Sequence, residues 1–446
     1  MTTPADRAQR GRDARRRASR SSHGLWIPDA DRLDPRTVLA RQDASRLPAL
    51  LPLRYERMAA SPFAYLRGAA AAMAADLAPQ PRTGLTVQLC GDAHLLNFGV
   101  VTSPERAPLP DLFDLNDFDE TLPGPFEWDV KRLAASIAVA ARDNGQSDAH
   151  ARRAVQAAAE AYRTSMHRLA GLGELALWYE RSDSTDLVPL IRAGQHARGG
   201  DGRSPATRHT RLRPLEKLTD MVGGQLRITP DPPLLEPLER LDMAALRRIF
   251  IGYRSTLPEE RRTLLDRFRF VDAARKVVGV GGVGARCYLV LLEGRDAGDP
   301  LILQIKQADR SVLQPHLPPS AYAQQGHRVI AGQRLLQAAG DIFLGWVTGP
   351  EGRHFYWRQL RDMKGASTVG DLTPSLLLDH ARLCGTTLAR AHARSGDRIA
   401  IASYLGSADT FDRAMADFAR RYADRNSVDH AALAAAVAAG RPPIAS

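Results

Sequence analysis

The sequence predicts an α+β protein in which one β-rich segment lies between two helix-rich segments. The chain has 446 residues, of which 44% are hydrophobic and 25% are charged, so it can form a large globular core. Apolar residues recur at helical spacing in much of the first half and again near the C-terminus, whereas strand-like runs gather between residues 270 and 359. Helices and strands are therefore largely segregated along the chain, which favours the α+β class.

The first helix-rich segment contains one short β element. Helical spacing begins near Leu25, and the clearest predicted helices cover residues 65–77, 128–141 and 148–172. Residues 85–90 (LTVQLC) and 109–115 read as buried strands with turn-rich sequence around them. Residues 195–213 are rich in Gly, Ser and Arg, which is typical of a loop or linker.

The second half begins with strands and returns to helices. Strands are predicted at residues 276–280, 287–292, 301–306, 342–347 and 354–359, and helices at residues 321–338, 375–394 and 410–439. We therefore predict a disordered basic tail (1–24), a helix-rich lobe (25–265), a β-rich lobe (266–362) and C-terminal helices that complete the helical lobe (363–446).

The net charge of +11 is a weak argument for nucleic-acid binding, because much of it is local. Seven arginines stand within residues 1–20 against Asp6 and Asp13, so this tail supplies +5. The remaining chain shows no interleaving of basic and aromatic residues, and no specific nucleic-acid partner is expected. No apolar run reaches the ~18–20 residues of a membrane span, so we expect a cytoplasmic protein without membrane association.

The most specific motif is Gly91-Asp92-Ala93-His94-Leu95-Leu96-Asn97, which follows the first predicted strand. Its position after a strand predicts a loop. In a loop, the Asp92 carboxylate can accept or orient a hydroxyl proton, and the amide oxygen of Asn97 can bind a hard cation. The alternative for each residue taken singly is structural, with Asp92 capping a turn that Asn97 closes.

An acidic run extends from Asp114 to Glu120. On a strand, Asp117 and Asp119 would share one face and Asp114 would oppose them. Carboxylates this close to an apolar strand are unfavourable unless a divalent cation or a bound cationic group neutralises them. The alternative is a solvated acidic loop.

The string Gly91-Asp92-x-His94-x-x-Asn97 is similar to the catalytic loop H-G-D-x-H-x-x-N of aminoglycoside and choline phosphotransferases, relatives of the protein kinases. This resemblance implies a catalytic base at Asp92 and a magnesium ligand at Asn97, with His94 as a supporting residue. Cys90 stands where that family has its first His. The bracing contact of that His must therefore come from elsewhere.

The same resemblance extends to the residues that follow the loop. It implies that Asp117 is the second magnesium ligand, with Asp114 as its competitor and Asp119 as a supporting residue. The string Phe126-Glu127-Trp128-Asp129-Val130 resembles the start of a later helix in that family, where an Asp braces the catalytic loop from behind. Asp129 is the corresponding structural residue.

A glycine cluster, Gly279-Val280-Gly281-Gly282-Val283-Gly284, lies between two predicted strands. Residues 286–291 after it read as a strand, which disfavours a Rossmann fingerprint and favours a kinase-type glycine loop over nucleotide phosphates. Lys306, one of only five lysines, follows on the next apolar strand, where an ammonium needs an anionic partner such as a phosphate. A glycine-rich hairpin without a ligand is the alternative. No Asp or Glu occurs between residues 310 and 340 to hold Lys306, so Gln325 or Gln333 would substitute.

These parts occur in an order that differs from that of kinases, because the catalytic loop precedes the glycine loop. The string LCGTTLARAH (383–392) resembles the helix that comes directly before the loop in phosphotransferases. A circularly permuted, two-lobed, protein-kinase-like fold reconciles the two orders. Residues 355–360 would then be the hinge strand that contacts adenine, or an ordinary strand.

Four strings also resemble a widespread bacterial family known only as a domain of unknown function: SPFAYLRG (61–68), GDAHLLNFG, FDLNDFDETLPGPFEWDVKR and RQLRDMKG. For Arg67 and Lys364, within these strings, salt-bridge and phosphate-contact roles both stay open. The expected function is magnesium-dependent transfer of phosphate from ATP to an unknown hydroxyl acceptor. The alternatives are a nucleotide-binding module without transfer activity and a metal-dependent phosphohydrolase built on the acidic run.

Overall fold

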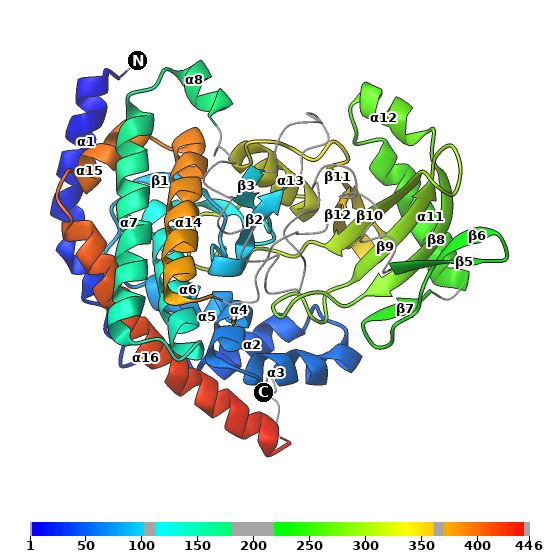
Figure 1. Cartoon of the computed structure of the whole chain (residues 1–446), viewed down its shortest axis with the longest axis horizontal. Coiled ribbons are helices and arrows are strands. Elements are labelled where there is room, and N and C mark those ends of the chain that lie inside the picture. Colours follow the sequence, from blue (N-terminus) through cyan, green and yellow to red (C-terminus); the bar gives the residue numbers. More distant parts are fainter. Residues whose placement is uncertain are drawn as a thin grey trace.

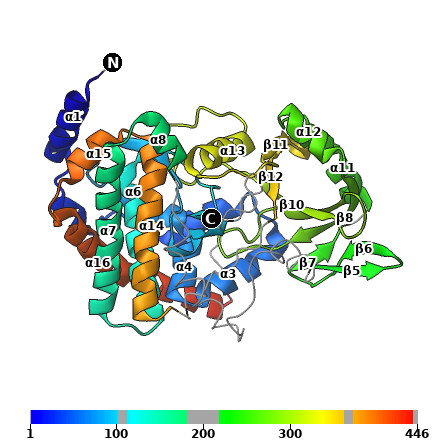
Figure 2. The ribbon, with the colours of Figure 1, turned by 45° about the horizontal axis from the view of Figure 1, so that its top comes forward.

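The computed structural model describes residues 2–101, 112–180, 218–238, 240–360, 370 and 372–440. The predicted linker 195–213 and Lys364 lie outside these ranges. The described residues form a helical part and a sheet part, so the predicted α+β class is confirmed (Figure 1). Figures 1 and 2 both place α13 (Gln325–Leu336) between the two parts, and it packs against one helix of the helical part and against two strands of the sheet part.

Long helices with alanine-rich faces build the helical part. They are α6 (Phe126–Asp143), α7 (Asp148–Ala170), α14 (Pro374–Ser395) and α16 (Thr410–Ala438). Small side chains allow close helix packing, and apolar residues of all four helices join one continuous core with β1 (Thr86–Leu89) and β3 (Leu112–Leu115). These helices support the short strands from which the Gly91 loop emerges.

The N-terminal residues form a helix, so the prediction of a disordered tail over residues 1–24 is wrong. Helix α1 (Pro4–Arg17) begins with a capping box between Thr3 and Asp6 and packs against α15 (Arg398–Leu405). Its arginines are used locally, because Arg15 donates to the Tyr404 carbonyl at the end of α15 at 3.0 Å. An arginine that the sequence predicts to be solvated therefore donates a hydrogen bond to a backbone carbonyl at the C-terminus of a helix.

The sheet part is built on an antiparallel sheet with the strand order β11-β12-β10-β9-β8-β7. The strands are β7 (Leu235–Pro237), β8 (Arg269–Lys276), β9 (Cys287–Glu293), β10 (Pro300–Gln307), β11 (Gly345–Thr348) and β12 (His354–Gln359). Helix α11 (Arg240–Arg254) covers one face, where Tyr253 stacks on Trp357 with ring centroids 4.4 Å apart. The sheet part therefore begins before residue 266, the predicted lobe boundary.

Two short antiparallel pairs frame the Gly91 loop: β1 with β4 (Leu122–Pro125), and β2 (Phe98–Val101) with β3. The remaining elements are α2 (Pro35–Asp43), α3 (Leu51–Ala59), α4 (Pro62–Gly68), α5 (Ala70–Leu77), α8 (Glu174–Tyr179), β5 (Thr219–Val222), β6 (Gln225–Ile228) and α12 (Glu259–Leu265). In the described part of the chain, no helix has the length and apolar character required to cross a bilayer.

Several predicted boundaries need correction. The helix expected at 65–77 is divided into α4 and α5 around Ala69. The strand expected at 276–280 lies earlier, because β8 ends at Lys276 and residues 277–286 form the connection to β9. Glycines and valines are interspersed in that connection. Its apolar pattern resembles that of a strand, so the pattern alone does not distinguish a strand from a glycine loop.

Candidate active site

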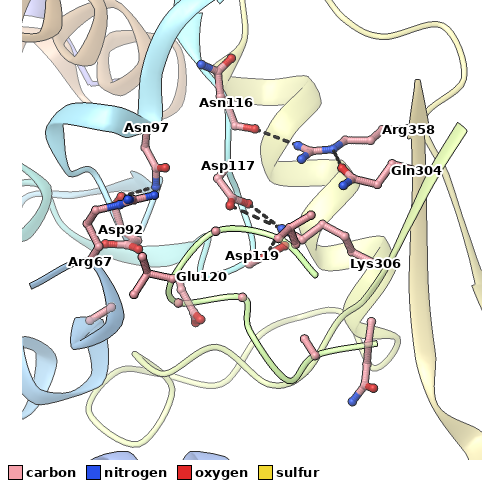
Figure 3. Close-up of a pocket in the computed structure, with 18 of the residues that line it drawn as sticks. Arg67, Asp92, Asn97, Asn116, Asp117, Asp119, Glu120, Gln304, Lys306 and Arg358 are labelled. Carbon is pink, nitrogen blue, oxygen red and sulfur yellow. Dashed lines mark hydrogen bonds and ion pairs between the residues drawn. The ribbon is translucent and has the colours of Figure 1, made fainter. Parts of the chain in front are cut away.

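A polar cavity of about 410 Å³ lies between the helical part and the sheet part (Figure 3). Most of the predicted site residues line it: Asp92, His94, Asn97, Asp117, Asp119, Gly279, Gly281, Gly282 and Lys306. They come from four separate segments that tertiary packing brings together: 92–97, 117–119, 279–282 and strand β10 with Lys306. Asp114, Asp129 and Gly284 are not among the residues that line this cavity.

The loop from Gly91 to Asn97 is held from behind by a carboxylate. The backbone N–H groups of Cys90 and Gly91 donate to the two Asp129 oxygens at 2.7 and 3.0 Å. Gly91 has φ +90°, and a Cβ there would lie 2.3 Å from the Glu120 carbonyl oxygen, so no other residue fits without a shift. Asp129, at the start of α6, thus occupies the bracing position that the resemblance implies.

Cys90 itself supplies a further brace. Its Sγ lies 3.2 Å from the backbone carbonyl of Asp117, which ties the Gly91 loop to the acidic run. The thiol is buried, and burial raises its pKa well above the ordinary value, so it remains a neutral donor. We expected the bracing contact to come from a residue other than Cys90. Cys90 itself ties the loop to the acidic run.

The Asp92 carboxylate faces the cavity and is oriented by an arginine. Arg132 on α6 donates to Asp92 Oδ1 at 2.8 Å. Burial raises the pKa of Asp92, and Arg132 partly offsets this effect. The Asn97 Nδ2 donates to the Asp92 backbone carbonyl at 2.6 Å, so the amide oxygen is the atom that it offers to a ligand. His94 is neutral because burial lowers its pKa well below the ordinary value.

Lys306 forms ion pairs with two carboxylates of the acidic run at the wall of the cavity. The Lys306 Nζ lies 3.2 Å from Asp117 Oδ1 and also contacts Asp119, and its side chain is only 6% exposed. Burial alone would lower the pKa of Lys306, but the two carboxylates outweigh it and raise the pKa well above its ordinary value. Lys306 is therefore charged, and this ammonium offsets part of the negative charge of Asp117 and Asp119.

The structure permits a direct test of whether the residues fit magnesium. In the described ranges, no group of three or more His, Cys, Asp and Glu side chains is arranged to hold a metal ion. Magnesium, however, is usually bound by one or two carboxylates together with substrate phosphates and water. Asp117 and the Asn97 amide oxygen are ligand types that fit a site of this kind, in which a bound phosphate and water supply the other ligands. They are too few to bind the ion by protein groups alone.

Asp114 lies apart from these residues, and its contacts leave no role as a metal ligand. Its carboxylate accepts from the Leu115 and Ala338 N–H groups, each at 2.8 Å, and pairs with Arg390 on α14. The side chain of Asp114 is buried. Between the two candidates, the geometry favours Asp117.

A family model described as uncharacterized protein conserved in bacteria (DUF2252) matches residues 46–436. The chain belongs to this family. No curated protein and no solved structure matched the chain. The match includes every predicted site residue described above and all residues that line the cavity except Gln42.

The glycine loop of this DUF2252 protein is fixed by the segment that contains α2, α3 and α4. Gly279 and Gly284 adopt positive φ values of +64° and +88°, which glycine accepts readily. Arg57 donates to the Gly279 carbonyl and the Leu47 N–H to the Gly284 carbonyl, each at 2.8 Å. Sequence reasoning missed this contact, since the two segments are more than 200 residues apart.

Two predicted contacts of Lys306 are wrong. Gln333 donates to Gln337 at 3.0 Å, and Gln325 accepts from Arg328 at 2.8 Å, so neither glutamine is placed to hold Lys306. Asp119 takes this role, and its other oxygen accepts from the Tyr356 hydroxyl at 2.6 Å. Both partners of Lys306, Asp117 and Asp119, belong to the acidic run. The helix after β10, where kinases have a glutamate, was the wrong place to expect its partner.

Two further cavity residues, Arg358 and Glu120, escaped the sequence analysis as site residues. Arg358, at the end of β12, donates to Gln304 at 2.8 Å and to the Asn116 carbonyl at 2.9 Å. Glu120 lines the cavity with a pKa raised by burial to about 7. A signal was available for Arg358, because it belongs to the string RQLRDMKG shared with the family. Gln359, the last residue of β12, and Leu360 after it also line the cavity.

Proposed function

We propose that this protein is a magnesium-dependent phosphotransferase that moves the terminal phosphate of ATP to a hydroxyl acceptor. One observation carries the proposal. Lys306 forms an ion pair with Asp117 at 3.2 Å, and both residues line a cavity that Asp92, Asn97 and the glycine loop also line. These are the chemical parts that phosphoryl transfer requires, namely a phosphate-binding lysine, a metal-binding carboxylate and a base for the acceptor.

The arrangement of the sheet supports a kinase-like order of parts within it. The glycine loop connects β8 to β9, Lys306 stands on the adjacent strand β10, and α13 and β12 follow. Protein kinases likewise place their glycine loop before a lysine on the third strand, with a helix after it.

The circular permutation is supported by the closeness of two chain segments, the end of α14 and β1, which would be consecutive in an unpermuted chain. The C-terminal end of α14 lies beside β1, where the Gln88 N–H donates to the Ser395 hydroxyl at 3.1 Å. In an unpermuted chain, this helix would lead directly into the strand before the Gly91 loop. The short distance between the two ends is what a permuted two-lobed fold requires.

The proposed step conserves atoms and charge. The acceptor oxygen forms a bond to the terminal phosphorus while the bond between that phosphorus and the bridging oxygen breaks. The electron pair of the broken bond stays on the departing ADP, and the hydroxyl proton passes to Asp92. Asn97 and Asp117 would hold magnesium, which supplies charge neutralisation for the phosphate oxygens. Lys306 would leave Asp119 in part to bind phosphate.

Nucleotide titration tests the proposal directly. We expect ATP to raise the melting temperature only when magnesium is present, and Lys306→Met and Asp117→Asn to abolish this shift. Asp92→Asn should retain binding and lose ADP formation in a mixture of hydroxylated metabolites, since it removes only the base. Arg41→Gln, an exposed substitution on α2, is the matched control. Absence of any stabilisation of the native protein by nucleotides would refute the proposal.

A nucleotide-binding module without transfer activity is the second candidate. It is favoured by the engagement of Asp92 with Arg132 and of Lys306 with two carboxylates, because both groups are already neutralised. It predicts magnesium-dependent binding in the native protein with no ADP formation from any acceptor. The phosphohydrolase alternative instead predicts phosphate release that survives Lys306→Met.

A further inference from the structure

Arg67, the penultimate residue of α4, lines the cavity without a protein partner. Within the described residues it makes no ion pair or hydrogen bond through its guanidinium, and its Nε is buried. A buried guanidinium donor without an acceptor is unfavourable, whereas an anionic ligand would satisfy several of its N–H groups at once. The side chain therefore has the properties of a binding residue.

Other cations of the cavity differ in this respect. Lys306 contacts Asp117 and Asp119, and Arg358 donates to Gln304 and to a backbone carbonyl. Arg46 donates to the Val283 carbonyl in the glycine loop. Arg310 lies three residues after the end of β10 and is exposed to solvent, where its charge is hydrated. Arg67 is thus the half-buried arginine of this cavity whose charge is still available to a ligand.

The backbone around Arg67 is fixed on two sides. Arg132, which orients Asp92, also donates to the Leu66 carbonyl at 2.6 Å. On the other side, a Cβ on Gly281 would lie only 3.1 Å from the Arg67 carbonyl oxygen, so the end of α4 packs directly on the glycine loop. The end of α4 that carries Arg67 is therefore held between Arg132, which orients the proposed base, and the loop expected to cover phosphates.

The charges that act on Arg67 indicate the same position. Burial lowers the pKa of Arg67, and the carboxylates of Asp92 and Asp117 act in the opposite direction. These are the proposed base and the proposed metal ligand. Figure 3 shows Arg67 beside Asp92 and Asn97, on the side of the cavity opposite Lys306.

We propose that Arg67 binds the terminal phosphate of the nucleotide at the point of transfer, so that it is a catalytic residue of this site. The inference rests on the proposed function and adds to it a residue outside the three motifs. A guanidinium presents several donors in a planar fork that matches phosphate oxygens, and its charge would stabilise the phosphoryl group during transfer. Lys306 would act from the opposite side.

Comparison of two nucleotides tests the assignment without knowledge of the acceptor. Binding of MgATP and MgADP is measured by calorimetry for the native protein and for Arg67→Gln. We expect the variant to bind MgATP about tenfold more weakly and MgADP unchanged, because a charge-assisted contact to the terminal phosphate is lost. Arg67→Lys should recover part of the ATP affinity, since it retains the charge but loses the fork.

The controls separate this inference from the proposed function. Arg41→Gln, with the same change in charge on the exposed face of α2, should leave both affinities unchanged. If the native protein binds MgATP and Arg67→Gln weakens both nucleotides equally or neither, the assignment of Arg67 is refuted and the proposed function stands. If the native protein binds no nucleotide, both fail.

The other source of a phosphate anion is the acceptor. Titration of inorganic phosphate into the MgADP complex distinguishes it. Loss of phosphate binding in Arg67→Gln with unchanged MgATP affinity would place Arg67 at the acceptor and overturn its assignment to the nucleotide.

Discussion

Lys306 on β10 and Asp117 after β3 form an ion pair with an Nζ to Oδ1 distance of 3.2 Å. The two residues belong to different parts of the molecule and are separated by 189 positions in the chain. Lys306 is the ion-pair partner of both Asp117 and Asp119, and these pairs join the sheet part to the acidic run. Several consequences can be measured.

Removal of the Lys306 ammonium should destabilise the protein in the absence of ligand. Lys306→Met leaves the partly buried Asp117 and Asp119 carboxylates without their cation, and loss of one partner of a buried pair costs about 3 kcal/mol. Urea unfolding at neutral pH measures the loss. The double variant Lys306→Met, Asp117→Asn should be more stable than Lys306→Met alone. Equal stability of the two variants would show that the Asp117 carboxylate is not unfavourable in the absence of Lys306, against this prediction.

Glu120 should make stability depend on pH. Burial raises its pKa to about 7, above the ordinary value of 4.5, so the folded state binds the proton more tightly than the unfolded state. Its contribution is fully present below pH 4.5 and is lost as pH rises through about 7. The Glu120→Gln variant cannot ionise at this position. Its melting temperature relative to the native protein should therefore rise between pH 5 and pH 8, and a constant difference would contradict the assignment.

Asp129 should matter for turnover more than for nucleotide affinity. Asp129→Asn replaces one oxygen that accepts from Cys90 or Gly91 with an amide nitrogen, which cannot accept a hydrogen bond. We expect a loss of about 1–3 kcal/mol in stability and a lower kcat, with MgATP affinity within a few-fold of the native value. Calorimetry and steady-state kinetics separate the two effects. Unchanged kcat would show that the loop needs no brace.

The contact between Arg57 and the glycine loop should restrict loop motion. Arg57→Ala removes the hydrogen bond to the Gly279 carbonyl, and this exposed contact contributes only about 1 kcal/mol. Amide hydrogen exchange in residues 277–286 should accelerate, whereas Arg41→Ala should leave it unchanged. Equal exchange in both variants would mean that the loop is held by other contacts.

Helix α1 gives a test of the N-terminal correction. Deletion of residues 2–20 removes the hydrogen bonds from Arg15 and Arg20 to the end of α15, together with the packing of Ala14 in the core. The melting temperature should fall by several degrees. A solvated tail would have no such effect, so an unchanged melting temperature would restore the original prediction.

Much of the site could be predicted from the sequence because its motifs are local. The spacing of Asp92 and Asn97 after a strand, and of a glycine cluster before a strand with Lys306, identifies chemistry that a single loop or hairpin presents. The Ala-rich and alternating patterns likewise indicate most helices and strands. These signals depend on residues close together in the chain, which is why they survive without tertiary information.

The sequence by itself pointed to a set of site residues most of which line the cavity, because their motifs are local, and to most of the helices and strands that hold them. Only the tertiary structure decided that Asp119 and not a helix glutamine accompanies Lys306, that Asp114 pairs with Arg390, and that α4 brings Arg67 to the cavity. The physical reason is that the energy of a buried charge depends on its nearest partners, and in this fold those partners come from segments far apart in the chain.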